Sequence, residues 1–228
     1  MALLCVGDRG AGRGESHVKA CRHLARVDPV MRALMTRVGS CGLAPRRDYF
    51  ATLCDSIIAQ QLSPKAAAVI FDRFADLYTI RRPTPSAVLG TPLTRLRGVG
   101  LSSQKARYLK DLASGFRDGR IQPRRLVRQS NEEIIATLVS IQGIGRWTAE
   151  MFLIFSLNRP DVLPVDDLGI RKAVQRWYHL RAIPKPRTVR KIGKPWHPYE
   201  TIASWYLWHS LHRAPADLVT RLKRRASP

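Results

Sequence analysis

The residues best suited to chemistry lie in one stretch, LVSIQGIGRWTAEMFLIFSLNRPDVLPVDD, which runs from Leu138 to Asp167. The stretch ends in two adjacent carboxylates, Asp166 and Asp167. A carboxylate that is held in place can stabilise developing positive charge, or orient and deprotonate an attacking water. Acids also gather at helix N-termini because the helix dipole favours them there. We interpret Asp166 in this second way, as the N-cap of a helix that runs to about Tyr178.

The turn Gly143-Ile144-Gly145 lies between two apolar segments with helical spacing. Two glycines two residues apart permit positive φ and a close approach to the backbone. The helix after the turn begins with N–H groups that lack acceptors, at the positive end of its dipole. Such a helix start can bind phosphate through the main chain, and Arg146 beside it adds a cation. The pattern therefore fits contact with a nucleic-acid backbone without reading of bases, although it also fits an ordinary corner between helices.

The net charge of the chain points to an anionic partner. Among 228 residues, Lys and Arg number 39 and Asp and Glu number 17, which gives a formal charge of +22. The commonest polyanion that such an excess binds is nucleic acid, while the alternative is a basic surface with no specific ligand. A hydrophobic fraction of 45% rules out a disordered tail, and the length suits one large or two small domains.

The cysteines and the apolar segments exclude several classes of protein. The four cysteines are Cys5, Cys21, Cys41 and Cys54. No CxxC pair occurs and no cysteine follows Cys54, so a zinc ribbon or a C-terminal iron–sulfur cluster is excluded. No apolar run reaches the length of a membrane span, and the first residues lack a signal-peptide pattern. We therefore expect a soluble, intracellular protein without membrane association.

The elements that must position these residues are helices. Period-2 alternation is almost absent, so the sequence predicts an all-α fold. Asp28-Pro29 either interrupts the first helical pattern or starts its second helix, Ser63-Pro64 starts another, and Ser130 with Glu133 forms a capping box. Helices are predicted over residues 20–38, 48–61, 64–78, 102–116, 131–139, 146–158, 166–178 and 199–212. We expect residues 1–20 to be a mobile extension, residues 179–197 a basic, irregular connection, and residues 215–225 a basic helix or tail.

Three separated segments of the chain resemble one known family. LVSIQGIGRWTA with DVLPVDD, the upstream IIAQQLSPKAAAVIF and the downstream KPWHPYETIASWYLWH resemble the helix-hairpin-helix plus Gly/Pro-Asp superfamily of DNA base-excision glycosylases. The branch that the chain resembles most is the 3-methyladenine DNA glycosylase II type, over about Asp28 to Arg213. The resemblance implies two helical subdomains that flank a cleft containing the active site. Residues 49–159 would form the helix-hairpin-helix subdomain, and residues 21–48 with 160–228 the subdomain that carries the catalytic aspartate.

The resemblance assigns the chemistry to Asp167, the second carboxylate of the pair. Cleavage of an N-glycosidic bond builds positive charge on the sugar, which a nearby carboxylate stabilises. Trp147 lies where bifunctional relatives carry a Schiff-base lysine, so base removal is expected without strand nicking. No cofactor is expected to be needed for the chemistry.

Three side chains are expected to line the base pocket, namely Trp147, Met151 and Trp205. Electron-rich rings attract a cationic alkylated purine by cation–π stacking. Met151 lies one helical turn after Trp147 and would share its face. Ordinary core packing is the alternative for all three. Trp177 and Trp208 are interpreted as core residues, and Trp196 as either core or cleft wall.

The resemblance also implies the DNA contacts and an ion site. Gly143, Gly145, Arg146 and Thr148 of the hairpin would hold the backbone. Gln60 and Gln61, in a break between helices, would enter the minor groove and fill the gap left by a flipped base; capping of a helix end is the alternative. The main-chain carbonyls of Val139, Ile141 and Ile144 would hold Na⁺, K⁺ or another cation.

The sequence therefore predicts a monomeric, monofunctional DNA glycosylase of base excision repair. It would flip alkylated purines out of duplex DNA and hydrolyse the bond to deoxyribose, leaving an abasic site. 3-Methyladenine and 7-methylguanine are the first substrates to test, and ethenoadenine, hypoxanthine and 1-methyladenine remain open. The alternative is a non-catalytic DNA-binding protein built on the same hairpin, which would have no use for Asp167.

Overall fold

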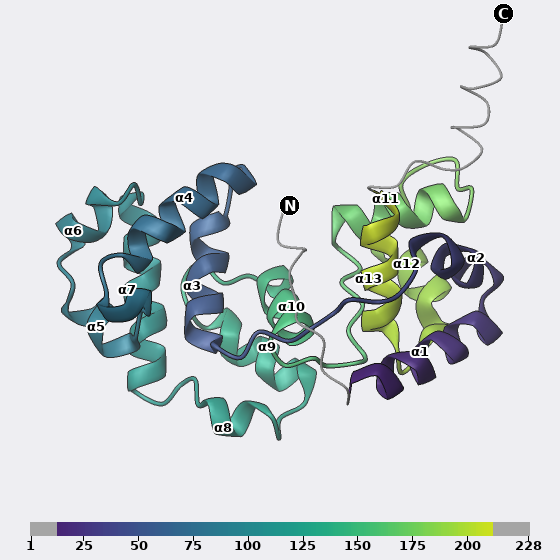
Figure 1. The fold of residues 1–228 in the computed structure, drawn as a ribbon, viewed down its shortest axis with the longest axis horizontal. Coiled ribbons are helices and arrows are strands. Elements are labelled where there is room, and N and C mark those ends of the chain that lie inside the picture. Colours follow the sequence, from purple (N-terminus) through teal and green to yellow (C-terminus); the bar gives the residue numbers. More distant parts are fainter. Residues whose placement is uncertain (1–12, 212–228) are drawn as a thin grey trace, which may run out of the picture. The chain divides into compact units, whose positions relative to one another are not determined.

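The computed structural model describes residues 13–211, and within that range the chain forms helices and no strand (Figure 1). The predicted all-α fold is confirmed. In chain order, with η marking a 3-10 helix, the elements are α1 (Arg13–Val27), α2 (Pro29–Val38), α3 (Tyr49–Ala59), α4 (Pro64–Ala75), η1 (Thr79–Arg81), α5 (Pro85–Gly90), α6 (Leu93–Gly98), α7 (Ser103–Arg117), α8 (Pro123–Leu126), α9 (Asn131–Val139), α10 (Arg146–Phe155), α11 (Leu168–Trp177), α12 (Pro186–Gly193), η2 (Lys194–Trp196) and α13 (Glu200–Leu211). None of the described helices is both long enough and apolar enough to cross a membrane.

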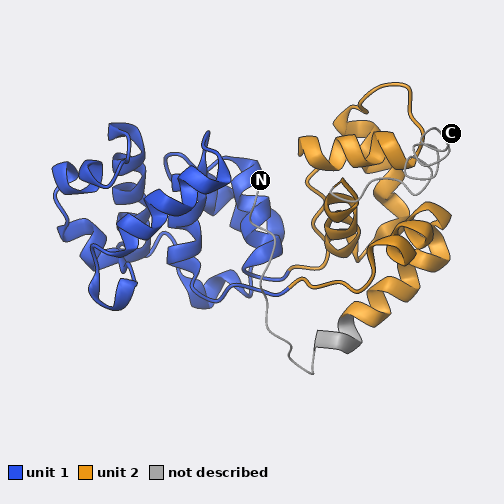
Figure 2. Cartoon of the chain, turned by 45° about the horizontal axis from the view of Figure 1, so that its top comes forward, with its two compact units in different colours: residues 1–7, 44–158 blue, residues 8–43, 159–228 orange. Residues whose placement is uncertain are grey.

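The chain divides into two compact units (Figure 2). Unit 1 is formed by residues 44–158 and contains α3 to α10; the described part of unit 2 is formed by residues 13–43 and 159–211. The sequence placed the first division between residues 48 and 49, whereas the structure places it between 43 and 44. Residues 44–48 join unit 1 because the Arg46 N–H donates to the Phe155 carbonyl at 2.7 Å and its guanidinium pairs with Asp55 at 3.2 Å.

Within unit 1, α7 is the central element. It packs against α3, α5 and α6, while α9 packs against α10 (Figure 1). Leu109 and Leu112 of α7 are fully buried, as are Leu53 and Ile57 of α3. The apolar face of α7 therefore holds together three helices that precede it, and the hairpin between α9 and α10 is tied to α7 by the Gln142 N–H, which donates to Asp111 at 2.8 Å.

The start signals in the sequence mark helix boundaries correctly at several positions. The Asp28 side chain caps α2, with Pro29 in the first turn, so Asp28-Pro29 starts a second helix. Ser63 caps α4 and Ser102 caps α7 in the same way. The capping box of Ser130 with Glu133 is present in both directions. These positions were predictable because a cap depends only on neighbours a few residues away.

Two segments differ from the sequence prediction. Residues 1–20 do not form one extension, because α1 already begins at Arg13; residues 1–12 lie outside the described range. Buried Ala20 and Leu24 anchor the second half of α1. Once this half is formed, the helix extends toward its N-terminus through polar residues, because each added residue gains a hydrogen bond without a new nucleation step. The connection 179–197 also contains α12 and η2, since its prolines occupy first-turn positions and Val189 is buried. The predicted tail at 215–225 lies outside the described residues.

Unit 2 is organised around one buried carboxylate, Asp28. Besides the Val30 and Met31 N–H groups, it accepts hydrogen bonds from the Tyr178 hydroxyl at 2.5 Å and from the Trp196 indole N–H at 2.8 Å. Burial, and then the hydrogen bond to Asp28, raise the pKa of Tyr178, which keeps this hydroxyl a donor. Trp196 is fully buried, so it belongs to the core. Asp28 therefore joins the start of α2 to α11 and η2.

Replacing Asp28 by alanine is expected to destabilise the protein by about 3–5 kcal/mol, because it leaves several buried donors without an acceptor. Thermal or denaturant unfolding measures the loss. Asp72→Ala is the matched control, since Asp72 is 66% exposed and pairs with the exposed Arg81, an interaction worth at most about 1 kcal/mol. Equal effects of the two substitutions would contradict the role given to Asp28.

Candidate functional site

The hairpin between α9 and α10 has the geometry of an anion-binding turn. Gly143 adopts φ +83°, in the left-handed region, and Ile141 and Ile144 anchor the turn in the core. Gly145 occupies the N-cap position of α10, and no side chain caps this helix. The first N–H groups of α10 therefore lack both intrahelical acceptors and a side-chain acceptor from the cap, which is the arrangement that binds phosphate.

The two glycines of the turn differ in backbone conformation and in their surroundings. A Cβ built on Gly143 would lie 2.1 Å from Cδ2 of Tyr108, so the turn packs directly on this ring. Gly145 has an extended backbone, with φ −92°, and a Cβ there would meet nothing within 4 Å. Gly143 is thus fixed by conformation and packing, whereas Gly145 leaves open space in front of the start of α10.

Arg146 and Thr148 were expected to face the DNA backbone, but in the structure both side chains contact other parts of the protein. The Arg146 guanidinium donates to both carboxylate oxygens of Glu132 and pairs with Glu150 at 3.2 Å. The hydrogen bond with Glu132 raises the pKa of Arg146 and lowers that of Glu132. Thr148 is 6% exposed, so its side chain packs inside unit 1. Any contact of Arg146 with phosphate must therefore replace its contact with Glu132, which is itself 71% exposed.

The loop that follows α3 is tied to the hairpin. The Gln60 side-chain amide donates to the carbonyl of Gly143 at 2.6 Å. The Lys105 ammonium donates to the carbonyls of Ile58 at 2.8 Å and Gln60 at 2.6 Å, and partial burial lowers its pKa. Gln61 is exposed and adopts φ 57°. In this structure the Gln60 amide is bound to the turn and Gln61 is the residue that the loop presents, and the contact of either with DNA stays a prediction.

Replacing Lys105 by methionine is expected to weaken binding to duplex DNA by about 5–30-fold, equivalent to the ~1–2 kcal/mol that two carbonyls lose with their charged donor. The loop would then no longer be held at the hairpin. Fluorescence anisotropy with labelled duplex DNA measures the change. Lys110→Met is the matched control: Lys110 lies on the same helix and donates to the carbonyls of Leu89 at 2.6 Å and Thr91 at 2.5 Å. Equal losses of affinity would contradict the prediction.

The proposed cation site is compatible with the hairpin backbone. The Ile141 carbonyl accepts a hydrogen bond from the Ile144 N–H at 3.1 Å. A carbonyl oxygen retains a second lone pair, so Ile141 could still join Val139 and Ile144 around an ion. Among the described residues, no group of three or more His, Cys, Asp or Glu side chains is arranged to hold a metal. The site at the three carbonyls stays a prediction.

Asp167 is held more firmly than the sequence suggested. It is the N-cap of α11: its Oδ1 accepts from the Ile170 N–H at 2.8 Å and from the Trp208 indole N–H at 2.8 Å. Asp167 is 5% exposed, whereas Asp166 is exposed and does not cap the helix. The assignment of the cap to Asp166 is therefore wrong by one residue, because the helix begins at Leu168. The cap and the candidate catalytic carboxylate are the same residue.

Trp208 is a site residue that the sequence analysis missed. It was interpreted as core, and it is indeed buried, at 3% exposed. It nevertheless fixes Asp167 from α13, and Gly169 makes room: a Cβ on Gly169 would lie 2.9 Å from Asp167 Oδ1 and 3.1 Å from Trp208 Cδ1. A buried indole needs an acceptor for its N–H, which is the one signal that could have suggested such a partner.

Comparisons with known proteins place the chain in a family. The sequence model of the HhH-GPD superfamily of base excision DNA repair proteins matches residues 54–198. The chain belongs to the HhH-GPD superfamily. It is 38% identical over 214 residues to DNA-3-methyladenine glycosylase 1 of Schizosaccharomyces pombe, covering 92% of this chain and 94% of that protein. It is 31% identical to the alkylbase DNA glycosidase-like protein mag2 of the same yeast, covering 88% and 98%.

Solved structures of HhH-GPD proteins agree with this assignment. The 3-methyladenine DNA glycosylase Mag1 of S. pombe, in complex with abasic DNA, superimposes with a TM-score of 0.77 at 38% identity, over 86% of this chain and 98% of that one. The DNA-3-methyladenine glycosidase of Bacillus halodurans gives a TM-score of 0.76 at 32% identity, over 85% and 88%.

The aromatic residues expected in the base pocket differ in how they are placed in this HhH-GPD chain. Trp147, in the first turn of α10, is 44% exposed, and Met151 is half-buried on the same helix. Trp205 is 6% exposed; its ring stacks on His209 with centroids 3.7 Å apart, and Tyr206 lies edge-on at 5.0 Å. Trp205 is thus packed, which fits the core-packing alternative, and its place in a base pocket stays a prediction. Trp147 is thus the more exposed of the two indoles.

Proposed function

We propose that this protein is a DNA glycosylase of base excision repair that removes alkylated purines from duplex DNA by hydrolysis. The observation that carries this function is the buried carboxylate of Asp167, held by two N–H donors from Ile170 and Trp208. Asp167 also caps α11, as Asp28 caps α2, so its burial alone fits a structural role as well. Its place at the position that the family resemblance makes catalytic is what favours an enzyme over a protein that only binds DNA. The non-catalytic alternative is therefore not favoured.

Asp167 acts on the charge that develops at the sugar. As the bond between the base and C1′ breaks, its electron pair leaves with the base and the deoxyribose acquires positive character. The carboxylate stabilises this charge and orients the water whose oxygen then bonds to C1′. The two N–H donors set the direction of the carboxylate before the substrate arrives, so little reorganisation is needed in the transition state.

The proposed substrate class, alkylated purines, rests on how readily such a base leaves and on the exposed ring of Trp147. A purine alkylated at a ring nitrogen is cationic and departs readily, so it needs less help from an acid. The exposed ring of Trp147 attracts such a cation by cation–π stacking. The S. pombe and B. halodurans relatives are named for 3-methyladenine, which makes this base and 7-methylguanine the first substrates to test.

DNA is bound by the hairpin in unit 1. The uncapped start of α10 receives a phosphate, Gly145 lets the strand approach, and Arg146 turns from Glu132 to the backbone. Gln61, presented by the loop that Gln60 ties to the turn, occupies the space that a flipped base leaves. The net charge of +22 adds affinity that is independent of sequence and falls with salt.

Base removal proceeds without cleavage of the strand. A lyase step requires an amine that forms a Schiff base with the sugar, and position 147 carries an indole. The protein acts as a monomer in the compartment that holds the DNA, the nucleoid of a bacterium or the nucleus of a eukaryote.

The test is the release of purines from duplex DNA that has been treated with a methylating agent. Liberated 3-methyladenine and 7-methylguanine are separated by chromatography, and the DNA is examined for abasic sites and for nicks. We expect both bases, intact strands and no covalent complex after borohydride treatment. Binding of the duplex without release of any base would favour the non-catalytic alternative, and a trapped complex would indicate a lyase.

A further inference from the structure

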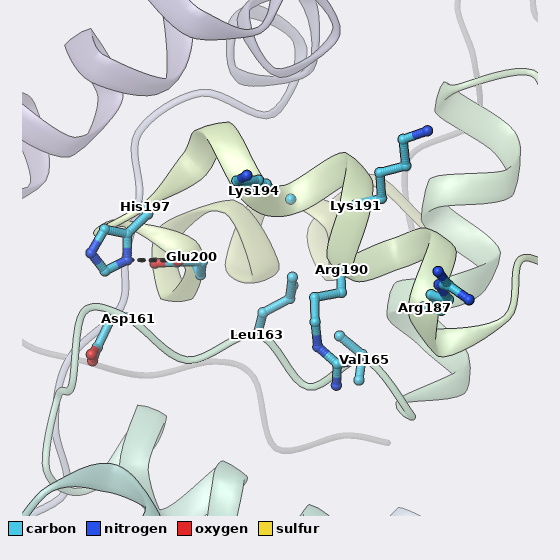
Figure 3. Close-up of a pocket in the computed structure, with 10 residues that line it drawn as sticks. Asp161, Leu163, Val165, Arg187, Arg190, Lys191, Lys194, His197 and Glu200 are labelled. Carbon is cyan, nitrogen blue, oxygen red and sulfur yellow. Dashed lines mark hydrogen bonds and ion pairs between the residues drawn. The ribbon is translucent and has the colours of Figure 1, made fainter.

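Unit 2 contains a cavity that none of the proposed functional residues lines. It has a volume of about 570 Å³ and lies between α12–η2 and the segment that precedes Asp167 (Figure 3). Its lining residues are Asp161, Leu163, Val165, Arg187, Arg190, Lys191, Gly193, Lys194, His197 and Glu200. This volume is in the range of ligand-binding pockets and admits a phosphate group with part of a flanking sugar.

The electrostatics of the cavity favour an anion. Four of its lining residues are cations of α12 and η2, and within the described part of the chain none of the four has an ion pair or a side-chain hydrogen bond. Exposed cations without an ion pair also occur elsewhere among the described residues, as at Arg124 and Arg125 of α8, so what distinguishes these four is that they line one hollow. Unpaired cations that gather around one hollow raise the local concentration of anions.

The two acidic residues that line the cavity lie at a different end from its arginines. In Figure 3, Asp161 and Glu200 lie at one end with His197, while Arg187 and Arg190 lie toward the other end. Glu200 Oε1 is paired with His197 Nδ1 at 3.0 Å. The Arg190 side chain extends from α12 to the apolar residues Leu163 and Val165 rather than away from the hollow. All four cations of the cavity are exposed residues, so their combined charge acts on an anion from the concave surface that they share.

The position of the cavity in the chain connects it to the reaction. Val165, which lines it, precedes Asp167 by two residues, so their Cα atoms are at most about 7 Å apart. That span is close to the repeat of one nucleotide along a strand. A phosphate held beside Val165 would therefore lie within a nucleotide or two of the sugar on which Asp167 acts.

We propose that the cavity binds a phosphate group of the DNA backbone, so that unit 2 holds the strand by side-chain cations while unit 1 holds it by the main chain of the hairpin. This inference rests on the proposed function, which supplies DNA as the partner. The phosphate contact orients the strand at Asp167 and takes no part in the chemistry. Free phosphate presents the same group, and the experiment separates the two sources.

The test is the salt dependence of binding to undamaged duplex DNA, which does not require catalysis. The double variant R190Q/K194Q removes two cavity cations, and R124Q/R125Q removes two exposed cations of α8 in unit 1 as a control with the same net charge. Each lost phosphate contact lowers the slope of log K against log salt by about 0.9. We expect a decrease of about 1–2 in the slope for the cavity variant, and of less than about 0.5 for the control.

Titration with inorganic phosphate, followed by amide NMR shifts at Gly193 and Lys194, forms the second arm. Shifts in the wild type that R190Q/K194Q abolishes, together with the reduced slope, support the DNA contact. Shifts without any change in slope assign the cavity to free phosphate and overturn the DNA contact. An unchanged slope with no shifts overturns the site altogether. Because both arms measure binding alone, they stand even if purine release fails and the proposed function is wrong.

Discussion

Replacing Asp167 by asparagine is expected to slow purine release by about 10²–10⁴-fold, the range typical of a lost general base or charge-stabilising group. Asparagine has the size of aspartate and keeps an oxygen that can accept from Ile170 and Trp208, so the cap of α11 should persist. What is removed is the negative charge opposite the developing positive charge of the sugar. Thermal stability and affinity for undamaged duplex DNA should therefore remain close to those of the wild type.

The measurement is single-turnover release of 3-methyladenine, with enzyme in excess so that product release does not limit the rate. Asp166→Asn is the control, since Asp166 has the same charge one residue earlier but is exposed and caps no helix. Its rate should stay within about 3-fold of the wild type, because a solvated charge outside the site contributes little. Wild-type release by the Asp167 variant, or equal losses in both variants, would refute the assignment.

Most of the helical frame could be predicted because its signals are local. Asp28, Ser63 and Ser130 each act on N–H groups two or three residues away, and the structure places a helix start after each of them. One helix, α12, was not predicted. α12 does carry local signals, with Pro186 in its first turn and Val189 and Ile192 three residues apart, but its length of eight residues made them too few to outweigh the surrounding prolines and cations.

The identity of the candidate catalytic carboxylate was available from the family motif, but its setting was not. Asp167 and Trp208 are 41 positions apart, and their hydrogen bond exists only because α11 packs against α13. The same holds for Gln60 and Gly143, which are 83 positions apart. The family resemblance aligns Gln61 with a leucine wedge, but only the fold shows that the amide of Gln60 is bound to the turn while Gln61 is exposed.

Arg146 and Trp205 show that residue type alone does not reveal whether a side chain is already in contact with other parts of the protein. Each has the chemistry expected of its proposed role, a cation for phosphate and an indole for a cationic base. In the structure the guanidinium is occupied by Glu132, and the indole is covered on one face by His209. A side chain is available to a ligand only if its neighbours leave it free, and those neighbours come from other parts of the chain. Exposure, rather than type, distinguishes Trp147 from Trp205.

Replacing Gly143 by alanine is the second substitution with a large expected effect. A residue with a side chain at φ +83° costs about 1–2 kcal/mol, and overlap of the new methyl with Tyr108 adds roughly 1–3 kcal/mol. Because the Gly143 carbonyl also accepts from Gln60, a displaced turn releases the loop as well. We expect a lower melting temperature and at least about 10-fold weaker binding to duplex DNA, equivalent to ~1.4 kcal/mol.

Gly145→Ala is the matched control within the same turn. Its backbone is extended and a methyl group there meets nothing within 4 Å, so stability should change by less than about 0.5 kcal/mol.

Removing the ring of Tyr108, on which Gly143 packs, gives a second check of the same prediction. In the double variant G143A/Y108A the overlap is gone, and the combined loss of stability should be smaller than the sum of the two single losses. Strict additivity would mean that the cost at Gly143 comes from its backbone conformation alone, and that the close contact with Tyr108 does not determine the shape of the hairpin.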